Sequence, residues 1–294
     1  MNLVGPPALA PGTLVAGYRV ERLLARGGLG SVVLARDAHH EPLALKLIDL
    51  GGSDGGELRR LFEREVAASR RLQHPGIVRI VDAGRSGDLA FIAMEFVAGG
   101  DLAQHRGGGT LPVRRALEIG ARVAQALAHA HAQGIVHRDV KPANILVDEG
   151  AAVVKLADFG LARLADLQRS RTGVLAGTPA YMTPEQLAEG AVDARADLYS
   201  LGVVLFELIA GRLPHEAGSL GELLRQVAQV DAPSLQQLRP DTPPAASGLV
   251  ARLLAKSRQQ RPRDAHELAL ELQAVLDALP PPIALPGESA PGAP

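Results

Sequence analysis

One short stretch, residues 135–146, constrains this chain more than any other. It reads IVHRDVKPANIL and sets an acid, basic residues, an amide and a proline between apolar residues suited to buried β-structure. Asp139 comes shortly before Lys141 and Asn144. Such a loop offers a carboxylate that positions a hydroxyl or accepts its proton, a cation for phosphate and an oxygen ligand for a hard metal ion. The pattern predicts a chemically active loop on a rigid frame.

A second carboxylate follows in a similar setting. Asp158, in the tripeptide DFG, comes soon after the apolar run at 153–156, and with Asn144 it offers the oxygen atoms that Mg²⁺ prefers. HRDVKPAN followed by DFG resembles the catalytic and metal-binding loops of the protein Ser/Thr kinase family, in the eukaryotic-like type found in bacteria. Either tripeptide alone arises easily by chance, but both in order and flanked by predicted strands very rarely do.

The resemblance covers residues 18–279 and implies an α+β, two-lobed protein-kinase-like fold. A small lobe would hold a five-stranded antiparallel sheet and one helix, and a larger lobe would be mainly helical. The expected division is an irregular N-terminal arm at 1–17, a small lobe at 18–94, a hinge at 95–101, a large lobe at 102–279 and a disordered tail at 280–294. Periodicity predicts strands at 18–24, 31–36, 43–48, 77–81 and 89–94, and helices at 57–73, 112–134, 197–208, 220–230, 246–255 and 265–279.

Composition excludes several classes of function. The formal net charge of -1 over 294 residues argues against nucleic acid as a partner. The chain has no cysteine, which excludes disulfides, thiolate zinc sites and a cysteine nucleophile. The N-terminus lacks the cationic region of a signal peptide, and the most apolar predicted helix is too short to span a bilayer. We therefore expect a soluble, cytoplasmic protein without a membrane partner.

A glycine-rich loop, ARGGLG at 25–30, lies between the first two predicted strands. Glycine lacks the Cβ that would keep backbone N–H groups away from phosphates, although alone this loop would be read as a plain hairpin. It resembles the kinase Gly-rich loop, with Ala25 in place of the first glycine. The resemblance implies nucleotide contacts from Ala25, Gly27, Gly28, Gly30 and Val32, and also from Ala44 and Leu146.

The third strand places a lone cation, Lys46, among apolar residues. A buried ammonium without a partner is costly, so it requires an anion. Glu65 shares one face of the helix at 57–73 with several apolar residues, which predicts a Lys46–Glu65 ion pair. Without Lys46, an ordinary solvated glutamate would be the better interpretation of Glu65.

By resemblance, the segment after the fifth strand is the hinge. The backbone of Glu95 and Val97 would bond adenine, Met94 would close the back of the pocket and Asp101 would reach the ribose, although core packing alone also accounts for Met94. The histidines of the helix at 112–134 do not have metal-ligand spacing, and we interpret them as structural. The same holds for His137, which in this family packs under the metal-binding turn.

Residues 158–185 resemble the activation and substrate-docking segment. Thr183 replaces the usual alanine before Pro184, and the Glu185 carboxylate is expected to pair with Arg261. Asp197, at the start of an almost wholly apolar helix, would accept bonds from the catalytic-loop backbone. Thr178 would face the catalytic residues. Phosphorylation is predicted at Thr172 and second at Ser170, with Arg138 as the group that senses the phosphate.

The predicted activity is transfer of the ATP γ-phosphate to Ser or Thr hydroxyls of protein substrates, with Mg²⁺, or Mn²⁺ in its place, as the metal. Mg²⁺, Gly-loop amides and Lys46, paired with Glu65, would hold ATP. Asp139 would orient the hydroxyl, and Lys141 matches the Ser/Thr branch. Self-association for phosphorylation in trans is part of this prediction.

Two rival functions stay open. A non-catalytic kinase-like binding module is favoured by Ala25 and by polar Ser69, which stands where the family often has an apolar residue. A small-molecule phosphotransferase of related fold would lack the GTPAYMTPE segment present here.

Overall fold

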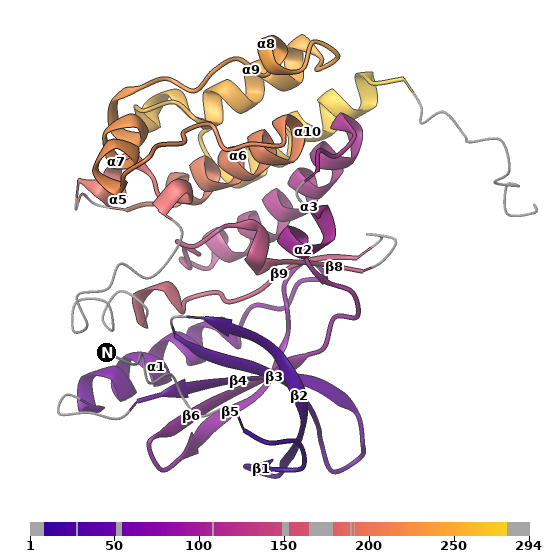
Figure 1. The fold of residues 1–294 in the computed structure, drawn as a ribbon, viewed down its shortest axis with the longest axis vertical. Coiled ribbons are helices and arrows are strands. Elements are labelled where there is room, and N and C mark those ends of the chain that lie inside the picture. Colours follow the sequence, from indigo (N-terminus) through magenta and orange to yellow (C-terminus); the bar gives the residue numbers. More distant parts are fainter. Residues whose placement is uncertain are drawn as a thin grey trace, which may run out of the picture.

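The computed structural model shows two lobes, a sheet with one helix and a larger helical body (Figure 1). It describes residues 9–27, 29–50, 55–107, 109–148, 153–164, 179–188, 190 and 192–280. Several predictions fall outside these residues, namely those for Gly28, Ser170, Thr172 and Thr178, and those for 1–8 of the N-terminal arm and 281–294 of the tail.

The small lobe is built on an antiparallel sheet with the strand order β1-β2-β3-β4-β6-β5. The sheet has six strands rather than the predicted five, because β1 forms inside the segment predicted to be irregular. Ala16 and Gly17 have φ of 49° and 91°, and two residues with positive φ favour a tight turn that pairs β1 with β2. The strands are β1 (Leu14–Val15), β2 (Tyr18–Gly27), β3 (Gly30–Arg36), β4 (Pro42–Asp49), β5 (Ile80–Ser86) and β6 (Leu89–Glu95).

Helix α1 (Gly55–Ser69) packs against this sheet and ends earlier than predicted. The residues that follow, predicted to be helical, form a tight turn in which the amide of Leu72 donates to the carbonyl of Ser69. Strand β5 also starts later than the strand predicted at 77–81. Ile77 bridges instead to Leu156 of the large lobe, and Val78 donates its amide to the Leu156 carbonyl, so this segment joins the two lobes.

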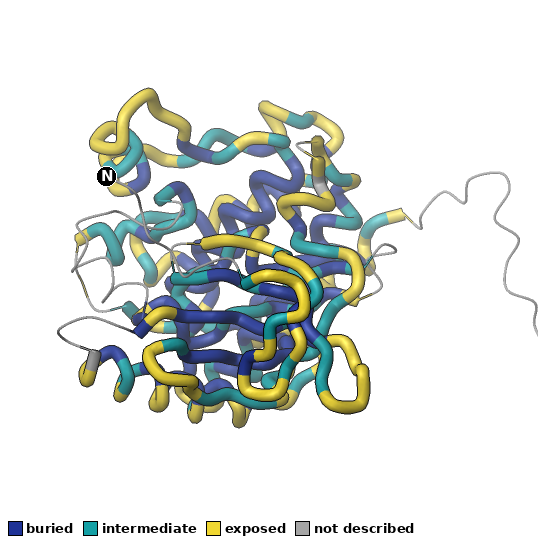
Figure 2. Tube along the Cα trace, turned by 60° about the horizontal axis from the view of Figure 1, so that its bottom comes forward, coloured by how far each residue is buried: buried dark blue, intermediate teal, exposed yellow. Residues whose placement is uncertain are grey.

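The large lobe surrounds α6 (Arg195–Ala210), which is buried along almost its whole length. Two glycines let neighbouring helices come close. A Cβ at Gly120 of α3 would lie 2.7 Å from Leu205, and one at Gly202 would lie 2.6 Å from Leu253. The dark-blue interior of Figure 2 includes this helix core. The other helices are α2 (Leu102–Arg106), α3 (Val113–Ala132), α5 (Pro184–Leu187), α7 (Leu220–Gln229), α8 (Leu235–Leu238), α9 (Pro244–Leu253) and α10 (Ala265–Ala278).

A small second sheet, β7-β8-β9, lies between the two lobes (Figure 1). Its strands are β7 (Gly100–Asp101), β8 (Ile145–Val147) and β9 (Val154–Leu156). The catalytic loop ends at β8 and the DFG turn follows β9, so this sheet fixes both loops next to the hinge. Among the described helices, none combines the length and the apolar character needed to cross a bilayer.

Candidate active site

The backbone of the catalytic loop is held by a buried carboxylate. Asp197, whose side chain is 1% exposed, accepts the amide of His137 at 2.8 Å and that of Arg138 at 2.7 Å. It also bonds the ring of His131 at 2.8 Å. Arg138 has φ of 69°, a conformation that is costly for a residue with a Cβ and persists where the surroundings hold it. The prediction that Asp197 accepts bonds from this loop is confirmed.

Three predicted catalytic-loop side chains meet at Asp139. Its Oδ2 accepts a bond from Lys141 Nζ at 2.7 Å and another from Asn144 Nδ2 at 3.0 Å. Asn144 also donates to the Asp139 carbonyl at 2.7 Å. The Asp139 side chain is still 41% exposed, so a substrate hydroxyl can reach it. The loop therefore holds an accessible carboxylate, a cation and an amide in one arrangement.

His137 supports the loop from beneath. Its ring lies edge-on to Phe159 with centroids 4.6 Å apart. The Nε2 atom lies 2.8 Å from the Ala157 carbonyl, which can only accept, so Nε2 carries the hydrogen. Nδ1 is then free to accept the Asp139 amide, which lies 3.2 Å away. The prediction that His137 is structural and packs under the metal-binding turn is confirmed.

Lys46 pairs with Asp158, so the predicted pairing with Glu65 is wrong. Its Nζ lies 2.6 Å from Asp158 Oδ2, and its side chain is 9% exposed. Burial pushes the pKa of Asp158 upward, but the adjacent Lys46 ammonium outweighs this effect and holds that pKa below its ordinary value. Asp158 is therefore ionised at neutral pH. It follows Ala157, whose amide donates to the Asn144 carbonyl at 2.8 Å and so keeps the two predicted metal ligands on neighbouring segments.

Glu65 has a different partner, which explains the wrong pairing. Arg163 Nη1 lies 3.3 Å from Glu65 Oε1. The chain after the DFG turn runs directly against α1, because a Cβ on Gly160 would lie 2.9 Å from Glu65 Oε2. Leu161 and Leu164 join the apolar cluster beneath α1. This packing brings Arg163 to the Glu65 carboxylate, and Lys46 takes the nearest remaining anion.

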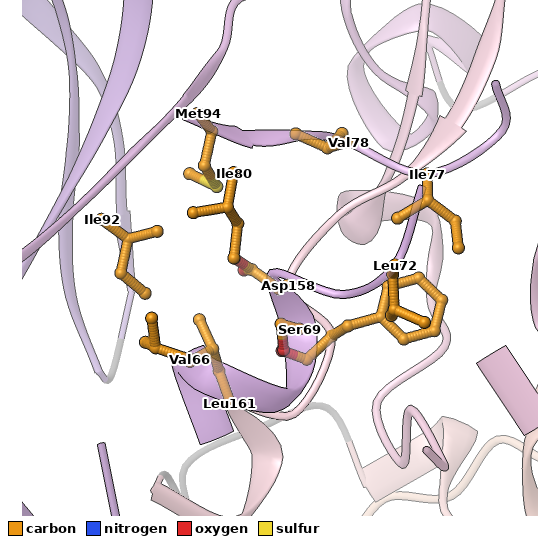
Figure 3. Close-up of a pocket in the computed structure, with 11 residues that line it drawn as sticks. Val66, Ser69, Leu72, Ile77, Val78, Ile80, Ile92, Met94, Asp158 and Leu161 are labelled. Atoms are coloured by element: carbon orange, nitrogen blue, oxygen red, sulfur yellow. The ribbon is translucent and has the colours of Figure 1, made fainter. Parts of the chain in front are cut away.

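A cavity lies between α1, β6 and the DFG turn (Figure 3). Ser69 and Asp158 bring oxygen atoms to an otherwise apolar lining. The Ser69 hydroxyl lies 2.9 Å from the carbonyl oxygens of both Glu65 and Phe159, so it connects α1 to the DFG turn. The lining consists of Val66, Ser69, Leu72, Ile77, Val78, Ile80, Ile92, Met94, Asp158, Phe159 and Leu161.

The glycine-rich loop tolerates alanine at position 25. Ala25 lies within β2 opposite Val32 of β3, and it is not among the residues with positive φ. Gly30 is different: its φ is 151°, and a Cβ there would overlap the carbonyl oxygen of Leu47. The backbone thus requires glycine at 30 but not at 25.

The predicted adenine-contacting residues gather at one place. Three of them are partly buried against the cluster that contains Met94, namely Ala44, Val97 and Leu146. Glu95 fixes the hinge to the large lobe, because its carboxylate accepts from Lys155 Nζ at 2.7 Å and from the Arg79 amide at 2.8 Å. Sequence reasoning missed Lys155, the middle residue of the short strand β9, which is only partly buried between two buried neighbours.

Asp101 has a structural partner of its own. Its carboxylate caps α2 by accepting the Gln104 amide at 2.8 Å, and it also accepts from the Gln104 side chain at 2.8 Å. A ribose contact from Asp101 stays a prediction.

The docking segment is fixed by a buried ion pair. Arg261, with a fully buried side chain, donates to Glu185 Oε1 at 2.7 Å and to Oε2 at 2.9 Å, which confirms the predicted pair. Its guanidinium also lies 4.8 Å from the centre of the Tyr199 ring. Burial raises the pKa of Glu185, but the Arg261 bonds outweigh it and leave that pKa below its ordinary value.

A family model for the protein kinase domain matches residues 18–271 of this chain. The chain belongs to the protein kinase family. The kinase resembles the serine/threonine-protein kinase Pkn2 of Myxococcus xanthus, at 39% identity over 92% of this chain and 34% of Pkn2. It resembles PrkC of Bacillus subtilis at 33% identity over 89% of this chain and 41% of PrkC.

The fold of the kinase also matches a solved structure. The PknI kinase domain of Mycobacterium tuberculosis aligns with a TM-score of 0.72 and 34% identity, over 91% of this chain and 99% of that domain. By contrast, the chain spans about a third to two-fifths of the length of Pkn2 and PrkC.

The predicted metal ligands of the kinase suit a hard divalent ion. Asn144 directs its amide nitrogen to Asp139, which leaves its carbonyl oxygen as the donor for a metal. Asp158 is ionised and uses one carboxylate oxygen for Lys46. Mg²⁺ is usually bound by one or two protein oxygens together with substrate phosphates and water, so this pair fits it. Among the described residues, no cluster of three or more His, Asp or Glu side chains offers another metal site.

Proposed function

We propose that this domain is an active protein Ser/Thr kinase that transfers the γ-phosphate of ATP to hydroxyls of protein substrates. The observation that carries the proposal is the Asp139 carboxylate, which is exposed and fixed at 2.7 Å by Lys141 and at 3.0 Å by Asn144. A binding module that does not catalyse transfer has no chemical need for this arrangement. The full-length activity of its relatives adds support, because their names describe Ser/Thr kinases.

In the proposed reaction, Asp139 accepts a hydrogen bond from the substrate hydroxyl and aims its oxygen at the γ-phosphorus. Lys141 holds that carboxylate and offsets negative charge on the transferred group. The leaving group is ADP, and the proton of the hydroxyl passes to Asp139. Asn144 and Asp158 would hold Mg²⁺, or Mn²⁺ in its place, and the ion would neutralise charge on the phosphate oxygens. Most of the acceleration comes from positioning and charge neutralisation, because the transition state is largely dissociative.

Lys46 has two tasks in this proposal. In the structure its ammonium group bonds the Asp158 carboxylate. With ATP present, it bonds the phosphates, and Glu65 replaces Asp158 as the anion that pairs with it. Adenine bonds the backbone of Glu95 and Val97, beneath Met94. These site roles, the cytoplasmic location where ATP is available, and the domain limits of 18–279 all belong to the proposal.

The regulatory part of the proposal concerns the segment before Thr178. Phosphate on Thr172, the first expected site, or on Ser170, the second, would bond Arg138 and order the docking segment. A second copy of the kinase would transfer this phosphate in trans. All three hydroxyls lie outside the described residues. Arg138 supports the idea because it directly precedes Asp139.

The test is transfer of labelled γ-phosphate from Mg-ATP to the kinase itself and to a generic protein mixture. We expect label on Ser and Thr after hydrolysis of the product. Saturable ATP binding without any transfer would overturn the proposal in favour of the kinase-like binding module. Label on a small molecule alone would favour the small-molecule phosphotransferase.

A further inference from the structure

The peptide group between Arg138 and Asp139 is held at both of its polar atoms. The Asp139 amide donates to His137 Nδ1 at 3.2 Å. The Arg138 carbonyl accepts a bond from the side-chain Nε2 of Gln186 at 3.2 Å. The amide on the other side of Arg138 donates to Asp197. Of these contacts, the one from Gln186 reaches the catalytic loop from α5, at the end of the docking segment.

The orientation of the Gln186 amide is determined by its neighbours. The amide N–H of Thr183 can only donate, and it lies 2.9 Å from Oε1 of Gln186. This contact identifies Oε1 as the oxygen and leaves Nε2 as the donor to Arg138. The Thr183 hydroxyl in turn accepts a bond from the backbone N–H of Gln186 at 3.1 Å, which completes a reciprocal cap at the start of α5.

The base of this contact is rigid. Thr183 is fully buried, and Glu185, between it and Gln186, is bound by Nη1 and Nη2 of Arg261. The bond to the Arg138 carbonyl thus starts from a fixed platform and ends on a residue with φ of 69°. A backbone in that conformation is sterically unfavourable and persists only when its surroundings hold it, so the position of the following Asp139 carboxylate depends on these contacts.

We infer that Gln186 is a positioning residue for catalysis, which acts by fixing the Arg138–Asp139 peptide and through it the direction of the Asp139 carboxylate. The inference rests on the proposed kinase function. It assigns the docking segment a second role: when α5 is seated, Gln186 completes the catalytic loop, and when α5 is displaced, Asp139 loses one of its supports. Small errors in placing a reacting group reduce rates by large factors.

Two substitutions test this role. Gln186→Glu keeps the oxygen that accepts the Thr183 amide but replaces the donor to Arg138 with an oxygen. Gln186→Met removes the donor without adding charge. For both variants we expect kcat to fall by about tenfold or more, with KM for ATP within about twofold of the wild-type value, because a misplaced Asp139 affects the transferred group and not nucleotide binding. Gln133→Glu makes the same chemical change at an exposed glutamine at the end of α3, and its kcat should equal that of the wild type.

A second measurement does not depend on activity. Hydrogen–deuterium exchange of a peptide that contains residues 136–141 should be faster in Gln186→Glu and Gln186→Met than in the wild type, and unchanged in Gln133→Glu. Wild-type kcat together with wild-type exchange in both Gln186 variants would overturn the inference. A fall in kcat with unchanged exchange would also overturn it, because Gln186 would then act on something other than this loop. If the wild type itself transfers no phosphate, the proposed function fails, while the exchange experiment still decides whether Gln186 fixes the loop.

Discussion

The guanidinium of Arg163 lies 3.3 Å from the carboxylate of Glu65. The Arg163 side chain is 43% exposed, whereas Glu65 is buried on the inner face of α1. Solvent screens the exposed guanidinium, so this pair contributes little, about 1 kcal/mol. The proposed function has Glu65 exchange Arg163 for Lys46 when ATP binds.

Replacing Arg163 should favour the exchange. We expect Arg163→Gln to raise the initial transfer rate of the unphosphorylated kinase, by up to about fivefold for a pair worth about 1 kcal/mol. Arg163→Lys keeps the cation and should behave like the wild type. The rate is measured on phosphatase-treated protein in the first minutes of reaction with Mg-ATP, and a lower rate in Arg163→Gln would contradict the prediction.

Asp139→Asn should abolish phosphate transfer. The amide has nearly the volume of the carboxylate but no longer draws the hydrogen of a substrate hydroxyl or the charge of Lys141 toward it. Because Asp139 is 41% exposed, Tm should change little. Transfer assays and ATP titrations on the same preparation check both parts, and wild-type turnover would remove Asp139 from the assigned role.

Ala25→Gly restores the family pattern in the phosphate loop and should change ATP affinity by less than about tenfold, equivalent to about 1.4 kcal/mol. The reason is that Ala25 pairs with Val32 across the sheet and does not have a positive φ, so alanine causes no strain there. Titration with ATP compares the two proteins. A larger gain in affinity would show that the Ala25 methyl group keeps the loop away from the phosphates, and it would strengthen the case for a non-catalytic module.

Glu185→Gln should destabilise the large lobe by about 3–5 kcal/mol, because it leaves the Arg261 guanidinium buried without its anion. Urea unfolding at neutral pH measures this loss. In the wild type the pKa of Glu185 is lowered on folding, so its contribution is complete above the ordinary value of 4.5 and is lost as the pH falls below it. The difference between the two proteins should shrink over that acid range; a constant difference would argue against the ion pair as its source.

His215 should make the kinase sensitive to mild acid. Burial, and then the nearby Lys256 ammonium, lower the pKa of His215 from 6.5 to about 4. The unfolded chain therefore binds an extra proton between pH 6.5 and about 4, and stability falls as the pH decreases through that window, by about 3 kcal/mol in total at about 1.4 kcal/mol per pKa unit. Denaturation curves at several pH values test this, with His215→Gln as the variant that should lose the slope.

The catalytic loop could be predicted from the sequence because its members are close in the chain. Asp139, Lys141 and Asn144 need only a local turn to meet, and in the structure Lys141 and Asn144 bond Asp139 at 2.7 and 3.0 Å. The Glu185–Arg261 pair was also predicted, although it is distant in sequence, because each residue belongs to a recognisable motif.

The actual partner of Lys46 could not be predicted, for a physical reason. Which anion a buried lysine bonds depends on where the whole of α1 lies and on how the chain turns after Gly160, and no periodicity in either segment determines that. The bond from Gln186 to Arg138 was missed for a related reason: the spacing of Thr183 and Gln186 is that of a helix cap, but nothing in it indicates that the turn brings Arg138 within reach.

The burial of Arg261 against Glu185 has a consequence for how the protein is made. The two residues are separated by 76 positions, and Arg261 lies close to the end of the described chain. During translation the catalytic loop, the DFG turn and the docking segment all leave the ribosome before the arginine that anchors that segment, and proteins fold broadly in the order of synthesis. A nascent kinase therefore carries its reactive residues without a seated α5. We therefore expect phosphate transfer to begin only after Arg261 has been synthesised and α5 is seated.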